Sequence, residues 1–332
     1  EAWNGCAEEQ WGAGIRRNEI MKKASVMNFN LVYYGKDEEK PLLSYFDNIF
    51  MPALTANIVR QTKDAKYFFI NVEVNQDNDG EYVLTGLLVK KTVLEVKSDI
   101  NEHGQLIEKD DRYPTAPYSM FVIYLKNHRM LYIENQKGSP DIRSFKAAIK
   151  FVVNRYVCNM NKELEEKGEE ELPIPIINVT GIPVRSKIDE ALKDVVKINQ
   201  LILRFYPLNG DIDYLVLLDG ISEDLRKKVG CKHGEIILKS PENVNGVIEV
   251  VSRSDGTVEP IFNVTYSDKR KGKIRNDEVS EKLEMDILGD TLDEKKSTIE
   301  KGKKIKAITY TSENNKKIYE EYQSKIIPFV KK

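Results

Sequence analysis

The stretch YFFINVEVNQDNDGEYVLTGLLV, residues 67–89, decides the fold of this chain. Its two ends, residues 67–74 and 82–89, are rich in aromatic and β-branched side chains, which favour strands. The acidic and amide residues between them lead into Gly80, and this is the chemistry of a tight turn. The stretch therefore predicts a β-hairpin.

A second hairpin is predicted further along the chain. The apolar runs YSMFVIYL (118–125) and RMLYI (129–133) are separated by a short basic tip. Aromatic residues interleaved with basic ones in this region could form a base-stacking platform. We favour a buried sheet with a basic tip, and its inner face would carry Phe121, Ile123 and Leu125. The first half of the chain is therefore predicted to be an antiparallel strand meander.

A long helix is predicted after the second hairpin. Ser139 can cap free backbone N–H groups, Pro140 suits a first helical position, and Asp141 suits the positive end of the helix dipole. Apolar side chains then recur at helical spacing, at Ile142, Phe145, Ile149, Val152 and Tyr156. We expect one face of this helix to pack on the sheet.

A charged segment with two prolines, residues 161–175, predicts a linker, because charge keeps a segment solvated and proline hinders regular pairing. Residues 21–160 would form a domain of strand meander plus helix. Residues 176–332 would form a smaller mixed α/β domain with a helical C-terminal tail. The predicted fold class is α+β.

The elements expected in the second part follow from apolar spacing. The spacing predicts a helix over residues 186–205 and a second helix over residues 313–326. Strands are predicted at residues 214–218, 234–239, 247–251, 261–266 and 305–310.

Composition limits the functions that the whole surface can serve. The 332 residues include 51 basic and 53 acidic side chains, for a formal net charge of −2. A surface that coats nucleic acid or anionic membrane is excluded, so any such contact must be a local patch. The chain has no apolar run near the roughly 20 residues that span a bilayer, which predicts no membrane partner. Its three cysteines form no CxxC pair, so no metal or other cofactor is expected.

The N-terminal residues suggest a bacterial source. Residues 16–21, RRNEIM, could be encoded by a ribosome-binding site, a short spacer and a start codon. We expect Met21 to be the initiator and residues 1–20 to be translated leader or disordered chain. The other interpretation is an amphipathic segment anchored by Trp3 and Trp11. Without an export signal, the expected location is cytoplasmic.

Glu95 and Lys97 offer one candidate catalytic pattern. They lie two apart in the strand-like run LEVK, so both side chains share a face, where a carboxylate can hold Mg²⁺ and a lysine can stabilise charge at a phosphate. This resembles half of the motif of restriction-endonuclease-like nucleases, and Asp79 would be the second carboxylate. A solvated face of an antiparallel strand explains the same residues, and we favour that interpretation.

A basic segment offers a candidate nucleic-acid site. Its basic residues are Lys269, Arg270, Lys271, Lys273 and Arg275. Beside an aromatic residue and with a glycine that lets backbone approach closely, such a cluster can bind phosphate. A solvated turn between a strand and a helix would look the same.

The order of these elements, with the run YLKNHRMLY at residues 124–132, resembles uncharacterised proteins of bacterial antiphage defence islands. The resemblance implies an accessory or effector role and supplies no catalytic residue. We expect a non-enzymatic protein that binds nucleic acid or a protein partner. A metal-dependent nuclease and a protein-interaction scaffold are the other two hypotheses.

Overall fold

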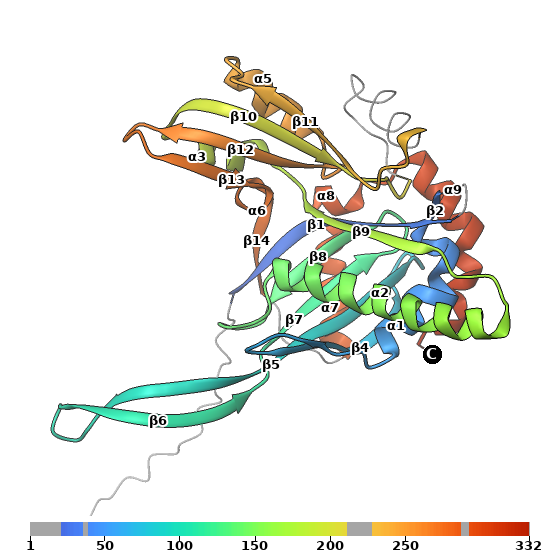
Figure 1. Ribbon diagram of the computed structural model, residues 1–332, viewed down its shortest axis with the longest axis horizontal. Helices are drawn as coiled ribbons and strands as arrows, with labels where there is room; N and C mark the ends of the chain where they lie inside the picture. The colour runs from blue at the N-terminus through green and yellow to red at the C-terminus, as the bar shows by residue number, and fades with distance from the viewer. Residues whose placement is uncertain (1–20, 36–38, 211–227, 287–291, 332) are drawn as a thin grey trace, which may run out of the picture.

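The computed structural model describes residues 21–35, 39–210, 228–286 and 292–331 (Figure 1). The fold is α+β, as predicted: a large curled antiparallel sheet, a smaller sheet, and helices on both. The predicted leader and the predicted strand at residues 214–218 lie outside the described residues.

The large sheet has the strand order β14-β1-β8-β7-β5-β4-β3, with β2 and β9 also paired to β1 and β6 paired to β5. Its strands are β1 (Met21–Tyr34), β2 (Glu39–Pro41), β3 (Arg60–Gln61), β4 (Lys66–Gln76), β5 (Tyr82–Ile100), β6 (Leu106–Thr115), β7 (Tyr118–Tyr124), β8 (Arg129–Glu134), β9 (Ile174–Gly181) and β14 (Lys282–Asp286). The small sheet has the order β11-β10-β12-β13, from β10 (Val195–Phe205), β11 (Gly234–Lys239), β12 (Val258–Tyr266) and β13 (Lys271–Arg275).

Helices and helical turns connect and cover the sheets. They are η1 (Leu42–Tyr45), η2 (Phe46–Phe50), α1 (Met51–Thr55), α2 (Ile142–Lys167), α3 (Arg185–Leu192), α5 (Val244–Arg253), α6 (Asn276–Val279), α7 (Leu292–Lys303), α8 (Lys306–Thr309), α9 (Glu313–Tyr322), η3 (Gln323–Lys325) and η4 (Ile327–Phe329).

Both predicted hairpins are confirmed. Strands β4 and β5 pair antiparallel around the predicted turn, and so do β7 and β8. In the first turn, the Asp77 carboxylate accepts hydrogen bonds from the backbone N–H groups of Asp79 and Glu81, both at 2.9 Å. Gly80 has φ +79°, a conformation that favours glycine. The turn chemistry therefore fixes the hairpin register.

Both faces of the large sheet are covered, not one. Phe121, Ile123 and Leu125 are buried as predicted, against α2 and the η1–α1 segment. The other face is buried under α7 and α8, which return from the end of the chain. Of the predicted basic tip, His128 and Arg129 are at most 2% exposed, whereas Lys126 is half-buried and paired with Glu81. The base-stacking platform is therefore excluded, since its aromatic side chains lie in the core.

Helix α2 crosses one face of the large sheet (Figure 1). Its N-cap is Asp141, whose carboxylate accepts from the Ser144 N–H at 2.8 Å, so the helix begins later than Ser139. The Phe145 ring packs on the rings of Phe29, Phe69, Phe121 and Tyr132, with centroid distances of 5.1 to 6.4 Å. This aromatic cluster joins α2 to the sheet.

Residues 161–175, predicted to be a linker, are instead the end of helix α2, a held turn and the start of strand β9. Helix α2 continues to Lys167 and ends at Gly168, where φ is +68°. The Asn161 side chain then holds the backbone of Leu172 through two hydrogen bonds of 3.0 and 2.7 Å. Strand β9 follows and pairs with β1 in the large sheet. The smaller unit therefore runs from α3 to α6, and the chain returns to the large sheet at β14.

The helix predicted over residues 186–205 is wrong after α3, because β10 is a strand. Its pairing with β12 is irregular between Ile198 and Gln200, which shifts the alternation of side chains by one position. Ile198 and Leu201 are therefore buried on the same side, three residues apart. A spacing of three residues between buried side chains is also typical of a helix, which explains the wrong prediction.

Two predicted strands are helices. Residues 247–251 belong to α5, where the Asn243 side chain accepts from the Gly246 N–H at 2.9 Å and so caps the helix. Residues 305–310 contain the short helix α8. The predicted strands β11 and β12 are confirmed, and α9 confirms the predicted C-terminal helix. No helix in the described ranges is long and apolar enough to cross a membrane.

Candidate functional site

Glu95 and Lys97 lie on a two-stranded arm, residues 92–115, which is formed by the second half of β5 and by β6 and projects beyond the large sheet (Figure 1). They share a face, as predicted, with their charged atoms 3.2 Å apart. Lys97 also contacts Asp110 at 3.1 Å, and hydrogen bonds to Asp110 and Glu95 raise the pKa of Lys97. Both side chains are about half exposed or more, which matches the solvated strand face.

The structure does not bring Asp79 to this pair. Asp79 lies in the turn before β5, whereas Glu95 lies far along that strand. The strand from Tyr82 to Glu95 spans about 40 Å at a rise of about 3.3 Å per residue. Asp79 is instead ion-paired with Lys303 of α7. The three residues of the nuclease hypothesis therefore do not form one Mg²⁺ site, and no group of three or more potential metal ligands occurs among the described residues.

The basic segment forms the hairpin between β12 and β13. Arg270 is paired with Asp268 at 2.5 Å, and Lys269 occupies the turn with φ +66°. Lys271, Lys273 and Arg275 alternate along β13, so they project from one side of the strand and are exposed. The predicted turn is thus a turn followed by an edge strand, and three of the five basic residues form one row.

Strand β13 brings this row to the open face of the small sheet. Helices α3 and α5 cover the opposite face, where Leu201, Phe262 and Ile274 are buried. The register defines the residues of the open face, which are Lys197, Gln200, Ile202, Arg204, Glu235, Ile237, Lys239, Glu259, Ile261, Asn263, Thr265, Lys271, Lys273 and Arg275.

Cations lie at both edges of the open face and amides lie at its centre. One transverse row reads Lys239, Gln200, Asn263, Lys273, and the Asn263 amide donates to the Gln200 side chain at 2.8 Å. The next row is apolar at Ile237, Ile202 and Ile261 and ends at Arg275. The open face is therefore a polar and basic surface with an apolar stripe.

Four lysines of the open face have no acidic partner among the residues that the structure describes. Lys197, Lys239, Lys271 and Lys273 make no ion pair with any described residue. Arg204, nearer the centre, contacts Glu235 at 2.6 Å and Glu259 at 3.5 Å. The positive potential is therefore concentrated at the two edges.

Helix α2 adds further cations beside the open face. Arg143, Lys146 and Lys150 have the three- and four-residue spacing that places side chains on one side of a helix. Arg143 contacts Asp277 at 2.9 Å. Loss of surrounding water lowers the pKa of Lys146, and attraction to Glu259 partly opposes this change. The α2 cations thus border the end of the open face that carries Glu259.

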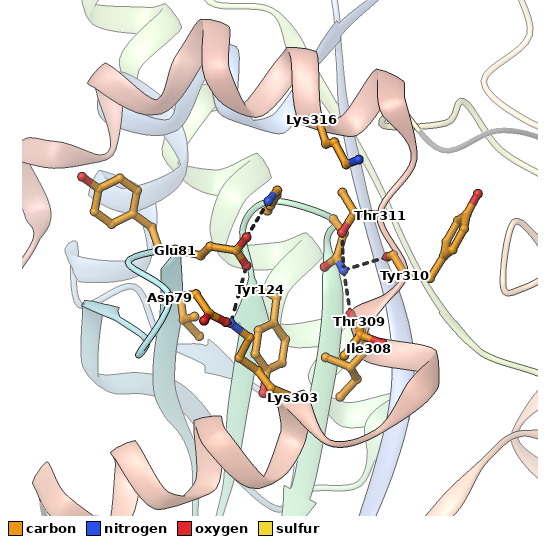
Figure 2. A pocket seen from close by; sticks show the side chains of 13 residues that line it. Asp79, Glu81, Tyr124, Lys303, Ile308, Thr309, Tyr310, Thr311 and Lys316 are labelled. Carbon is orange, nitrogen blue, oxygen red and sulfur yellow. Dashed lines mark hydrogen bonds and ion pairs between the residues drawn. The ribbon is translucent and has the colours of Figure 1, made fainter.

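A pocket of about 450 Å³ lined by charged and polar side chains lies where the C-terminal helices meet the turns of the large sheet (Figure 2). It is enclosed by the β4–β5 and β7–β8 turns and by the segment from α7 to α9. Lys126 contacts Glu81 at 2.5 Å, and Lys303 contacts Asp77 at 2.7 Å. Burial disfavours the charge on Lys303, but hydrogen bonds to Asp77 and Asp79 outweigh it and raise the pKa of Lys303.

The charged side chains of this pocket pair with each other and stabilise the fold. Lys303 and Lys126 are matched by the three acids of the β4–β5 turn, so the pocket has little charge left for a ligand. The Asn127 amide donates to the backbone oxygens of Ile308 at 2.6 Å and Tyr310 at 2.9 Å. The pocket therefore fastens the C-terminal helices to the sheet. The acid-rich turn and the lysine-rich tail were the visible sequence signals, but their pairing required the fold.

No protein-family model and no curated protein matches this chain.

Proposed function

We propose that this protein binds nucleic acid, without cleaving it, through the open face of the small sheet. The observation that carries the proposal is the set of lysines at the edges of that face that make no ion pair with any described residue, in a chain whose formal net charge is −2. A near-neutral protein attracts a polyphosphate only where positive charge is concentrated.

The spacing of the cations suits a phosphate backbone. Lys271, Lys273 and Arg275 follow each other about 6.6 Å apart along β13, at two strand rises per step. Lys239 lies across the sheet, about 14 Å away at about 4.8 Å per strand. Gln200 and Asn263 between these edges offer amide donors and acceptors to bases or sugars.

The cellular setting belongs to the same proposal. The resemblance of the element order and of the run at residues 124–132 to proteins of antiphage islands supports an accessory or effector role in the bacterial cytoplasm. The genomic copy can be changed to carry Lys239→Gln, Lys271→Gln and Lys273→Gln. Loss of protection against phage would support that role, and unchanged protection would count against it.

Binding is tested by fluorescence anisotropy with a single-stranded oligonucleotide and a duplex of equal length, over a series of salt concentrations. The test protein carries Lys239→Gln, Lys271→Gln and Lys273→Gln. Each lost phosphate contact removes about 0.9 from the slope of log affinity against log salt on duplex and about 0.7 on a single strand. We therefore expect the slope to flatten by about two to three units.

The matched control carries Lys162→Gln, Lys167→Gln and Lys317→Gln, which remove the same charge from exposed positions on α2 and α9. The control should keep the wild-type slope. An equal change in both proteins would mean that net charge alone matters, and no binding by the wild type would reject the function.

A further inference from the structure

The arm ends in an apolar and acidic tip, residues 100–108. Ile100 and Leu106 pair across the two strands and are 67% and 77% exposed. Glu108 lies two residues further along β6 on the same face, and Glu102 lies in the turn. Within the described part of the chain, neither glutamate makes an ion pair. A two-stranded hairpin in water is marginally stable, so such a tip gains from being covered.

The open face of the small sheet offers the matching surface. Its apolar stripe is buried at Ile261, half-buried at Ile202 and 48% exposed at Ile237, so the end of the stripe at Ile237 can receive apolar side chains. Lys239 and Lys273, which make no ion pair with a described residue, lie at the two ends of the row along one side of this stripe, and the row along its other side carries Arg204 with Glu235 and Glu259. The tip presents apolar groups beside carboxylates, and this side of the face presents an apolar group beside lysines, so the two are complementary in charge.

The arm cannot reach its own open face in this conformation, because it projects away from the small sheet (Figure 1). We propose that the tip of the arm docks on the open face of a second copy of this chain, so that self-association and nucleic acid compete for the same lysines. The competition rests on the proposed function, whereas the docking itself does not.

The contact is tested by charge reversal and rescue. One variant carries Glu102→Lys and Glu108→Lys at the tip, and the other carries Lys239→Glu and Lys273→Glu on the face. All four positions are exposed, so the fold should persist, and circular dichroism checks it. Analytical ultracentrifugation at low salt should show self-association of the wild type, weakened about tenfold or more in each variant by like charges.

An equimolar mixture of the two variants should associate again, because both tip-to-face contacts are then between opposite charges. Addition of a single-stranded oligonucleotide to the wild type should dissociate the assembly. A wild type that is monomeric at low salt, or a mixture that stays monomeric, overturns the docking. Nucleic-acid binding that leaves the assembly intact overturns the competition. Docking without any nucleic-acid binding would reject the proposed function alone.

Discussion

At the scale of single residues, Lys303 shows how one side chain can hold two distant parts of the chain together. Its ammonium group lies among Asp77, Asp79 and Glu81, and the Asp77 side chain is fully buried. A buried carboxylate is tolerated only when a partner and hydrogen bonds compensate for its lost hydration. Asp77 has both, from Lys303 and from the turn backbone.

We predict that Lys303→Met lowers the free energy of unfolding by about 3 kcal/mol, because it leaves the Asp77 carboxylate buried without its cation. Urea unfolding followed by circular dichroism measures the change. Lys304→Met is the matched control, since Lys304 is exposed at the same end of α7. A similar loss in both variants would show that the ion pair is not what stabilises this region.

At the scale of elements, a buried ion pair joins the two sheets. Arg129 of β8 is 2% exposed, and its guanidinium contacts the Asp255 carboxylate at 2.6 Å and the Asp255 backbone oxygen at 2.9 Å. Asp255 lies between α5 and β12 of the smaller unit. Asn276 adds a second link, since its side chain hydrogen-bonds the backbone N–H and oxygen of Gly181 at the end of β9. The orientation of the small sheet is therefore set by polar contacts.

Arg129→Leu should lower the free energy of unfolding by about 3 to 5 kcal/mol, because the pair is largely buried and the substitution removes one partner. Asp255→Asn should cost less, since the backbone contact remains. In a double-mutant cycle the two losses should not add, and the coupling energy should exceed about 0.5 kcal/mol. Additive losses would show that the two side chains act independently.

At the scale of the whole molecule, the C-terminal residues are held against strand β4 of the large sheet. Val330 forms a parallel bridge with Val74 of β4, and the Lys331 N–H donates to the Val74 oxygen at 3.0 Å. The Glu73 carboxylate accepts hydrogen bonds from the ammonium groups of Lys331 at 2.9 Å and of Lys295, on α7, at 3.2 Å. Partial burial raises the pKa of Glu73, but the hydrogen bonds from the two lysines outweigh it, so the net pKa is lowered.

A carboxyl group with a lowered pKa contributes stability that is present above its unfolded pKa, about 4.3, and is lost as the pH falls through its folded pKa. We predict that Glu73→Gln reduces the free energy of unfolding by about 1 kcal/mol at neutral pH. The variant should also lose less stability than the wild type between about pH 6 and about pH 3. Urea unfolding at a series of pH values tests this, with the exposed Glu321→Gln as control. Parallel pH curves for the wild type and the Glu73 variant would contradict it.

The local elements were predictable where short-range chemistry decides them. Turn residues and β-branched runs were sufficient for the β4–β5 and β7–β8 hairpins, and the apolar spacing after Asp141 was sufficient for α2. Both signals act between residues close in sequence, where propensity and periodicity apply directly. The basic segment that contains Lys271, Lys273 and Arg275 was visible in the sequence, but it was expected as a turn, and the structure makes these three residues part of a strand.

Tertiary structure alone decided which surfaces are covered and which charges meet. The bulge in β10 gave a strand the spacing of a helix, and only its pairing with β12 reveals the strand. Helices α7 and α8 pack on the second face of the large sheet and bury it. Arg129, expected at the surface, is buried and ion-paired with Asp255. Lys239 lies on the open face because β11 pairs with β10. These outcomes depend on contacts between residues far apart in sequence, and local propensity carries no information about such contacts.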